Sequence, residues 1–205
     1  MLEQLILVRH GETVHNAAGI AQGWNDSALS EVGIAQVRSL ARRLRNSGAN
    51  ALYSSPLGRA LSTAQYIAEE VGLEVTTLDE LREMSYGSWE GRSFLDVRSE
   101  DEAAYQRWIG DPDAQCPSGE SHNDVLRRMQ RAFATIERGP SNAIVVTHGT
   151  AIRIGATVLL GAPVTAARHL AQDNASLNLF VRRGERLVLK VWNDTTHCSD
   201  SGAPL

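Results

Sequence analysis

The 205-residue chain is long enough for one substantial core and short for two domains, and its 42% hydrophobic and 21% charged residues are typical of a soluble globular protein. A formal charge of −4, with Lys and Arg scattered along the chain, argues against a basic surface for nucleic acid. No apolar run approaches the roughly 20 residues that span a bilayer, and no signal-peptide pattern is present. Only Cys116 and Cys198 are available for disulfides. We therefore expect a cytoplasmic protein with no nucleic-acid or membrane partner, either monomeric or homodimeric.

The first half of the chain alternates between strand and helix patterns. The predicted elements are a strand at 5–8, a helix at 30–46, a strand at 51–53, a helix at 55–72 and a strand at 73–78. The first strand is a continuous apolar run, as in strands that are covered on both faces. The second helix begins with Ser55-Pro56, a cap followed by proline, and ends at Gly72.

The second half opens with an irregular stretch, residues 79–118, that contains several Gly and Pro breakers. It continues with a helix at 121–137, a strand at 143–147, a helix at 151–160 and strands at 177–181 and 187–192. Alternating strands and helices predict an α/β three-layer sandwich, with a mostly parallel central sheet flanked by helices on both faces. The last two strands are expected to add an antiparallel edge. We expect one catalytic domain over 1–197 and a flexible tail over 198–205.

Two histidines stand in equivalent positions. His10 and His148 each follow a buried apolar strand, and each precedes a glycine, which permits a tight exit and a close approach of the backbone. A single histidine at a strand end is more often a hydrogen-bonded structural residue. In open α/β sheets, however, ligands bind beyond the carboxyl ends of the strands. If the two strands are neighbours, both imidazoles meet in one crevice, beside Arg9.

Arg59 is a third candidate for this crevice. It lies in the opening turn of its predicted helix, counted from Pro56. Helix N-termini attract anions, and a guanidinium group adds a fixed charge and bidentate hydrogen bonds. Alone, Arg59 would be read as a solvated helix residue. Together with Arg9 and the two histidines, it suggests a local cradle for a phosphoryl group.

Six stretches of the chain resemble, in order, the motifs of the histidine phosphatase superfamily, the phosphoglycerate-mutase-like proteins. They are residues 7–13 with Asn16 and Gln22-Gly23, residues 26–33, residues 53–60 with Thr63-Ala64, residues 81–83 leading to 87–91, residues 119–121, and residues 146–149. The resemblance covers about residues 4 to 197. One Arg-His-Gly is weak evidence, whereas six ordered motifs are very specific.

The resemblance implies that His10 is a nucleophile that attacks phosphorus and forms a phosphohistidine. A neutral imidazole suits this role because it needs no deprotonation by a metal or a partner base. Arg9, Arg59 and His148 would hold the equatorial phosphoryl oxygens, where negative charge accumulates in the transition state. The small phosphatases of this family need no cofactor, and the sequence offers no convincing set of metal ligands.

The resemblance also assigns the remaining site residues. Glu83 would protonate the leaving alcohol and then activate the water that hydrolyses the phosphoenzyme. Without the resemblance, Glu83 could not be chosen over the other glutamates of its segment. Asn16 and Gln22 would donate hydrogen bonds to the phosphoryl group, and Gly23 and Gly149 would let the backbone come close to it.

The family contains phosphatases and mutases, which the Arg-His-Gly motif does not separate. Here the interval from Glu83 to His148 is compact, and residues 84–87 (MSYG) differ from the Glu-Arg-His-Tyr-Gly context of the mutases. The ending at 191–197 resembles that of the small phosphatases. We therefore expect a phosphatase acting on small phosphomonoesters. The alternatives are a cofactor-dependent phosphoglycerate mutase and an inactive phospho-ligand-binding scaffold.

The substrate is not fixed by these motifs. Selectivity is expected from residues 84–120 and from the region after His148, which would overhang the cradle. Candidate substrates include phosphoserine, 3-phosphoglycerate and its glucosyl derivative, α-ribazole 5′-phosphate and sugar phosphates. Two positions depart from the family pattern near this region: His15 stands where an aromatic residue is frequent, and Thr150 replaces a second glycine.

Overall fold

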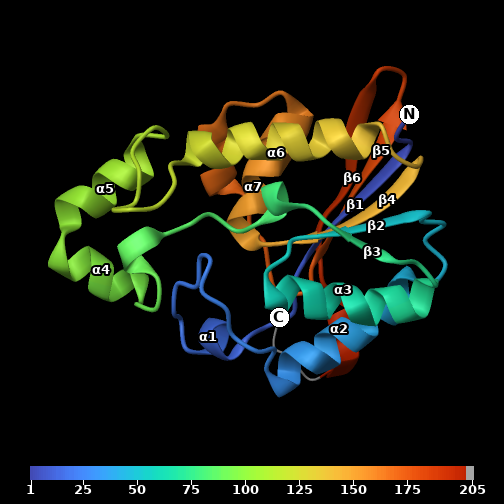
Figure 1. The fold of residues 1–205 in the computed structure, drawn as a ribbon, viewed down its shortest axis with the longest axis horizontal. Helices are drawn as coiled ribbons and strands as arrows, with labels where there is room; N and C mark the ends of the chain where they lie inside the picture. The colour runs from blue at the N-terminus through green and yellow to red at the C-terminus, as the bar shows by residue number, and fades with distance from the viewer. Residues whose placement is uncertain (202–205) are drawn as a thin grey trace.

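The computed structural model describes residues 1–201, and it contains a six-stranded sheet in the order β3-β2-β4-β1-β5-β6 (Figure 1). The strands are β1 (Gln4–Arg9), β2 (Ala51–Ser54), β3 (Val75–Thr77), β4 (Asn142–Thr147), β5 (Leu177–Arg183) and β6 (Arg186–Asp194). Strands β1 to β4 pair in parallel, whereas β5 pairs antiparallel with β1 and β6 pairs antiparallel with β5 at the edge of the sheet. The predicted α/β class and its antiparallel edge are confirmed.

Helices cover both faces of this sheet (Figure 1). The helices are α1 (Val14–Ala17), α2 (Glu31–Leu44), α3 (Gly58–Val71), α4 (Phe94–Glu100), α5 (Glu102–Gly110), α6 (His122–Glu137) and α7 (Gly149–Leu160), with 3-10 turns η1 (Asp79–Leu81), η2 (Gly87–Trp89), η3 (Val164–His169) and η4 (Thr196–Ser201). Helices α2 and α3 pack on one face, and α6 and α7 pack on the other. The result is the predicted three-layer arrangement.

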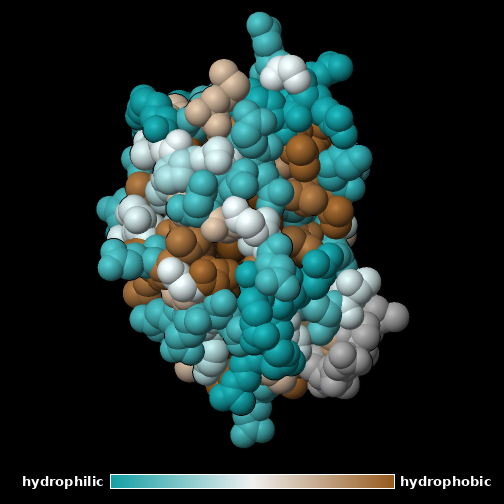
Figure 2. Space-filling model, turned by 90° about the vertical axis from the view of Figure 1, so that its right-hand side faces the viewer, coloured by the Kyte–Doolittle hydropathy of each residue, from teal (hydrophilic) through white to brown (hydrophobic). Residues whose placement is uncertain are grey.

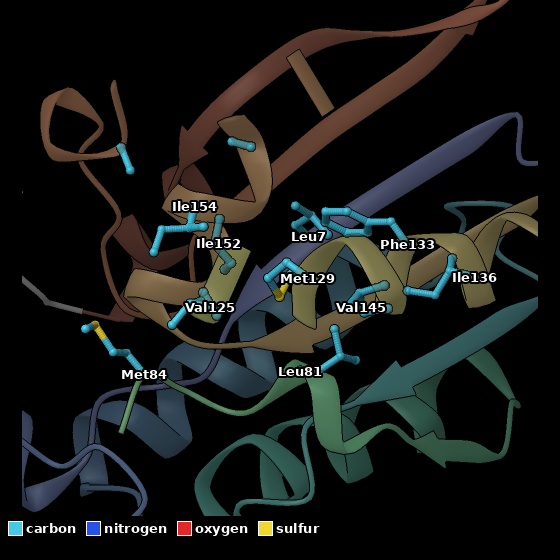
Figure 3. Packing of buried hydrophobic residues seen from close by; sticks show 14 of the residues in the cluster. Leu7, Leu81, Met84, Val125, Met129, Phe133, Ile136, Val145, Ile152 and Ile154 are labelled. Atoms are coloured by element: carbon cyan, nitrogen blue, oxygen red, sulfur yellow. The ribbon is translucent and has the colours of Figure 1, made fainter. Parts of the chain in front are cut away.

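The position of β1 between two helical layers explains why its sequence is an uninterrupted apolar run. Successive side chains of a strand point to opposite faces. Leu5 and Leu7 therefore join the core under α6 and α7, while Ile6 and Val8 join the core under α2 and α3. Figure 3 shows Leu7 packed with Phe133 and Met129 of α6. Because burying one such aliphatic side chain contributes about 1.5–3 kcal/mol, both faces of the sheet need apolar residues at this strand.

The pairing of β1 with β4 sets the place of the two histidines. The strands are parallel neighbours, and their register aligns Arg9 with Thr147. Both strands consequently end at the same level of the sheet. His10 and His148 follow at once, as the sequence pattern predicted.

Two helix starts differ from prediction. Helix α3 begins at Gly58, not at Pro56, with Leu57 as its N-cap residue. The side chain of Asp26, far away in the sequence, accepts hydrogen bonds from the backbone N–H groups of Gly58 and Arg59. Helix α7 begins at Gly149, two residues before the expected start, because the extended backbone of His148 serves as its N-cap. In both cases the helix N-terminus points at the strand ends.

The stretch 79–118, predicted to be irregular, contains helices α4 and α5. They form an arm that lies apart from the two main helical layers in Figure 1. An aromatic cluster holds the arm: the rings of Phe94 and Trp108 stack at 5.7 Å, and Tyr86 lies edge-on to Phe94 at 5.2 Å. Aromatic pairs at such separations stabilise beyond their burial alone.

At the chain end, the start of the segment 198–205, predicted to be a flexible tail, is ordered in the structure. Residues Thr196–Ser201 form a 3-10 turn, and Cys198 is buried. Residues 202–205 lie outside the described residues.

The face of the molecule opposite the arm, shown in Figure 2, is largely hydrophilic with a hydrophobic band across its middle. None of the helices within residues 1–201 combines the length and the apolar character needed to cross a membrane.

Candidate active site

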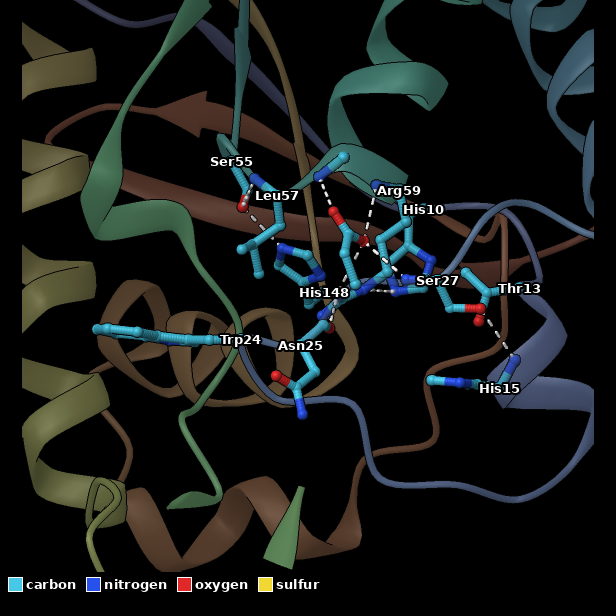
Figure 4. A network of polar contacts seen from close by, with 12 residues as sticks. His10, Thr13, His15, Trp24, Asn25, Ser27, Ser55, Leu57, Arg59 and His148 are labelled. Carbon is cyan, nitrogen blue, oxygen red and sulfur yellow. Dashed lines mark hydrogen bonds and ion pairs between the residues drawn. The ribbon is translucent and has the colours of Figure 1, made fainter. Parts of the chain in front are cut away.

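His10 and His148 meet at the end of the sheet, as expected from their matching positions. Their ring centroids are 5.1 Å apart, and the rings are inclined by 60°. Both side chains are buried. Figure 4 shows them with Arg59 in one network of polar contacts. His10 lines a cavity of about 290 Å³, here called the strand-end cavity, whose walls come from the β1 end, the loop at 20–23, α7 and residues 170–172.

The hydrogen bonds of His10 determine its tautomer. Nδ1 lies 2.7 Å from the backbone oxygen of Gly11, which can only accept, so Nδ1 carries the proton. The other nitrogen, Nε2, accepts a hydrogen bond from Nε of Arg59 at 3.3 Å. Burial lowers the pKa of His10 well below its ordinary value of 6.5, and the charges of Arg59 and Arg9 lower it further. His10 is therefore a neutral imidazole with its lone pair on Nε2.

Arg59 is buried and bonds to both the histidine and a loop. Its Nη2 donates to the backbone oxygen of Gly23 at 2.7 Å, and its Nη1 donates to that of Asn25 at 2.9 Å. Asp26 adds an ion pair at 3.3 Å. Arg59 also lines the strand-end cavity. The predicted anion-binding arginine thus also fixes the loop that carries Gly23.

Arg9 enters the cavity from the end of β1. Its Nη1 donates to the backbone oxygen of Gln172 at 2.5 Å, whereas its buried Nε has no hydrogen-bond partner within residues 1–201. Burial lowers its pKa from the ordinary value of an arginine, and the charge of Glu83 opposes this shift. Arg9 therefore has a free N–H donor beside the cavity. A buried N–H group without a partner costs free energy, so an acceptor at this place would be favoured.

Glu83 lies on the opposite wall at the N-terminus of α7. Its carboxylate accepts hydrogen bonds from the backbone N–H groups of Thr150 at 3.1 Å, Ala151 at 3.1 Å and Met84 at 2.8 Å. The helix N-terminus favours negative charge at this point. The side chain lines the cavity and is 8% exposed. Three backbone N–H groups therefore fix the position of the carboxylate.

His148 lies behind His10 and is not among the described residues that line the strand-end cavity. Its Nε2 is 2.8 Å from Oγ of Ser55, while its Nδ1 has no partner within the described chain. Burial, Arg59 and His10 lower its pKa well below 6.5. His148 is thus a second neutral imidazole, packed against the first.

The four remaining predicted residues, Asn16, Gln22, Gly23 and Gly149, all line the strand-end cavity. Oδ1 of Asn16 accepts from Asn174 at 3.1 Å and from the backbone of Thr13 at 3.2 Å. Gln22 is buried, and its Oε1 is unpartnered among residues 1–201. A Cβ at Gly149 would lie 3.4 Å from Nε of Arg9, so glycine keeps the helix start close to that guanidinium.

Sequence reasoning did not single out Arg153, Tyr86 and Gln172 of this cavity, and it named Thr150 only as a departure from the family pattern. Arg153 follows Gly149 by four residues in α7, and residues at that spacing share one face of a helix, so a signal for it was present. Its Nη2 donates to Oγ1 of Thr150 at 3.0 Å. Gln172 accepts a hydrogen bond from Arg9 through its backbone oxygen, and a pattern of side chains in the sequence cannot predict such a contact. His15, which stands at a departure from the family pattern, does not line the cavity.

The two buried neutral histidines predict a pH dependence of stability. In the unfolded chain both take up a proton near pH 6.5, but in the folded protein only at lower pH. Between these values the unfolded state binds more protons, so stability is full above about pH 6.5 and is lost as pH falls. Each histidine contributes up to about 1.4 kcal/mol per pH unit to this slope.

Replacing His148 with asparagine should therefore reduce the slope of unfolding free energy against pH, below pH 6.5, by up to about 1.4 kcal/mol per unit. Urea unfolding at several pH values measures the slope. His169→Asn, at an exposed position in η3, is the matched control and should keep the wild-type slope. An unchanged slope in His148→Asn would contradict the buried neutral state.

Comparison with known proteins connects this geometry to a family. The family model described as histidine phosphatase superfamily (branch 1) matches residues 5–195. A protein named "Probable phosphoglycerate mutase GpmB" from Yersinia pestis is 40% identical over 178 residues, which are 85% of this chain and 83% of that protein. The same name is carried by a relative of equal identity from Yersinia pseudotuberculosis.

Solved structures of the same fold include YhfR of Bacillus stearothermophilus, with a TM-score of 0.87, 29% identity and coverage of 95% of this chain and 98% of that one. A mycobacterial glucosyl-3-phosphoglycerate phosphatase complexed with VO3 has a TM-score of 0.85 and 30% identity, and the match covers 93% of this chain and 99% of that one. A phosphoserine phosphatase mutant from Entamoeba histolytica, in complex with phosphoserine, has a TM-score of 0.84 and 29% identity, and the match covers 95% of this chain and 98% of that one. The family model spans nearly the whole chain, and the chain belongs to branch 1 of the histidine phosphatase superfamily.

Proposed function

We propose that this chain is a phosphatase that hydrolyses small phosphomonoesters without a metal ion, by way of a phosphohistidine on His10. One observation carries the proposal. The Nδ1 proton of His10 is bonded to a backbone oxygen, which leaves Nε2 as a lone-pair nitrogen at a cavity that Arg9 and Arg59 also line. A neutral imidazole nitrogen is a nucleophile, and guanidinium groups balance the charge of a phosphoryl group.

In the first step, Nε2 of His10 forms a bond to phosphorus while the ester P–O bond breaks. The leaving oxygen takes a proton from the carboxyl group of Glu83 and departs as an alcohol. Arg9 and Arg59 stabilise the charge on the transferring group, as positioned cations do in phosphoryl transfer. The free Nε donor of Arg9 is available for this purpose.

In the second step, Glu83 accepts a proton from water as the water oxygen bonds to phosphorus. The N–P bond breaks, inorganic phosphate forms and His10 returns to its neutral tautomer. Three backbone N–H groups hold the Glu83 carboxylate, so it keeps one position in both steps. General acid–base catalysis of this kind contributes typically about 10²–10⁴-fold.

The other residues bind and position. Asn16 and Gln22 would donate hydrogen bonds to the phosphoryl oxygens, and Gly23 and Gly149 bring the backbone close to them. His148 is packed behind His10, so its role includes holding the nucleophile's ring in place. The places of Asn16, Gln22, Gly23 and Gly149 around the strand-end cavity support these four assignments.

A metal-independent phosphatase should hydrolyse para-nitrophenyl phosphate at an unchanged rate in excess EDTA. The reason is that Arg9 and Arg59 balance the charge of the phosphoryl group. In addition, the imidazole of His10 is already neutral and needs no metal ion to deprotonate it. A spectrophotometric assay after extended dialysis against the chelator measures this. A rate that collapses with EDTA and returns with added divalent ions would contradict metal independence.

A phosphoglycerate mutase is the second candidate, favoured by the name of the 40% identical Yersinia pestis relative. A mutase would keep the phosphoryl group in the cavity and return it to a different hydroxyl. An enolase-coupled assay with 3-phosphoglycerate and a bisphosphate primer distinguishes the two. We expect release of inorganic phosphate to exceed formation of 2-phosphoglycerate; the reverse order would make this chain a mutase. An inactive scaffold would bind phosphate and show neither reaction.

A further inference from the structure

A second cavity of about 270 Å³ lies beside the strand-end cavity. It is here called the arm cavity. One wall is the α4–α5 arm, through Phe94, Tyr105, Trp108 and Ile109. The other wall is α7 and η3, through residues that include Ile154, Val164 and Ala167. In Figure 1 the arm lies toward the end of the sheet at which β1 ends.

The two cavities meet at a shared partition. Tyr86, Phe94, Thr150 and Arg153 line both of them. The hydroxyl of Tyr86 and Oγ1 of Thr150 are 2.9 Å apart, so these two side chains are fixed to each other where the cavities adjoin. The arm cavity therefore adjoins the strand-end cavity at these four side chains.

The chemistry of the arm cavity is aromatic and aliphatic. Trp108 stacks with Phe94 at 5.7 Å and with His122 at 5.3 Å. Burial and the nearby Arg153 lower the pKa of His122 below 6.5, which leaves its ring uncharged. The charged side chains that line it are two arginines: Arg153, at the partition, is bonded to Thr150, and the exposed Arg168 is bonded to His169. Such walls favour an apolar ring over a charged group.

We propose that the arm cavity is the subsite for the alcohol portion of the substrate, and that this portion is an apolar group containing an aromatic ring. The inference rests on the proposed phosphatase function. Size supports it, because a cavity of about 150 Å³ accommodates benzene, so this one holds a larger group such as a fused pair of rings. The small charged alcohols of phosphoserine or phosphoglycerate would leave most of it unused.

The test compares two esters whose alcohols have similar acidity, ethyl phosphate and 2-(1-naphthyl)ethyl phosphate. The wild-type protein should turn over the naphthyl ester with a KM at least about 10-fold lower, because the ring is buried in the arm cavity and removed from water. Equal KM values for the two esters would overturn the proposal. So would a preference for 3-phosphoglycerate over both.

Two exposed residues of the arm provide a matched pair of variants. Ile109 lines the arm cavity, whereas Leu95 does not, and both side chains are partly or largely in solvent, 39% and 79% exposed. Ile109→Asp should raise the KM of the naphthyl ester about 10-fold and leave ethyl phosphate unchanged. Leu95→Asp should leave both unchanged. Identical behaviour of the two variants would contradict the subsite.

A binding measurement separates this proposal from the proposed function. Calorimetry with 2-(1-naphthyl)ethyl phosphonate, which cannot be hydrolysed, needs no catalysis. If neither ester is turned over but the naphthyl phosphonate still binds at least about 10-fold more tightly than ethyl phosphonate, the phosphatase fails and the subsite stands. Val164→Trp, which fills the arm cavity from its half-buried rim, should abolish that difference. If Val164→Trp binds as the wild type does, the ring lies elsewhere.

Discussion

Replacing His10 with alanine is expected to reduce kcat by at least about 10⁴-fold for every phosphomonoester tested, because in the proposed mechanism the phosphoryl group is transferred to its Nε2. The nitrogen is positioned by the Gly11 carbonyl and by Arg59, and among the described residues that line the strand-end cavity no other side chain offers an uncharged nucleophilic nitrogen. Initial rates with para-nitrophenyl phosphate measure the loss.

The control is His15→Ala, which removes an imidazole of α1 that does not line the strand-end cavity. It should retain activity within about twofold, as expected for a residue away from the reacting atoms. Binding of inorganic phosphate by His10→Ala should persist, because Arg9 and Arg59 remain. Substantial turnover by His10→Ala would remove the covalent mechanism.

Replacing Glu83 with glutamine is expected to have an effect that depends on the leaving alcohol. With alkyl phosphates, whose alkoxides are strongly basic, loss of the acid should cost about 10²–10⁴-fold in kcat/KM. With para-nitrophenyl phosphate, whose leaving group departs without a proton, the loss of kcat/KM should be at most about 10-fold. Breakdown of the phosphoenzyme should slow for both, because the general base is missing as well.

Glu80→Gln is the matched control in the same segment. Glu80 lies one turn earlier in η1, and its carboxylate does not line the strand-end cavity. It should leave both esters unaffected. If Glu83→Gln lowered kcat/KM equally for alkyl and aryl esters, Glu83 would be a structural anchor of α7 and not the acid.

The strands and their histidines are the part of the fold that the sequence predicts best. Continuous apolar runs at β1 and β4 mark strands covered on both faces, and a His-Gly pair follows each strand. The sequence does not establish that these strands are neighbours, because pairing depends on contacts across more than 130 residues. The register of Arg9 with Thr147 supplies that fact and brings His10 and His148 together.

The local sequence does not single out Glu83 as a site residue; only the resemblance to the family does. Glu80, Glu83 and Glu90 occupy one irregular segment, and nothing local distinguishes them. In the structure they differ in what they contact. Glu83 accepts from the first amides of α7, whereas Glu90 accepts from the backbone of Trp24, Asn25 and Tyr86 and so ties two loops together. These partners come from distant parts of the chain.

The arm and the double role of Arg59 could not be predicted for a similar reason. Helices α4 and α5 are only 7 and 9 residues long, too short to show a clear period, and aromatic contacts with Tyr86 and Trp89 hold them in place. Arg59 was expected to face an anion. Its bonds to the backbone oxygens of Gly23 and Asn25 depend on a loop whose path the sequence does not reveal.

Identification of the phosphorylated residue tests the central claim most directly. The Glu83→Gln variant, in which the phosphoenzyme breaks down slowly, is mixed with para-nitrophenyl phosphate, quenched in base and mapped by mass spectrometry. The phosphohistidine mechanism predicts a single acid-labile, base-stable phosphoryl group on His10, absent from the double variant with His10→Ala. A phosphoryl group on any other residue, or hydrolysis with none on the protein at any time, would contradict it.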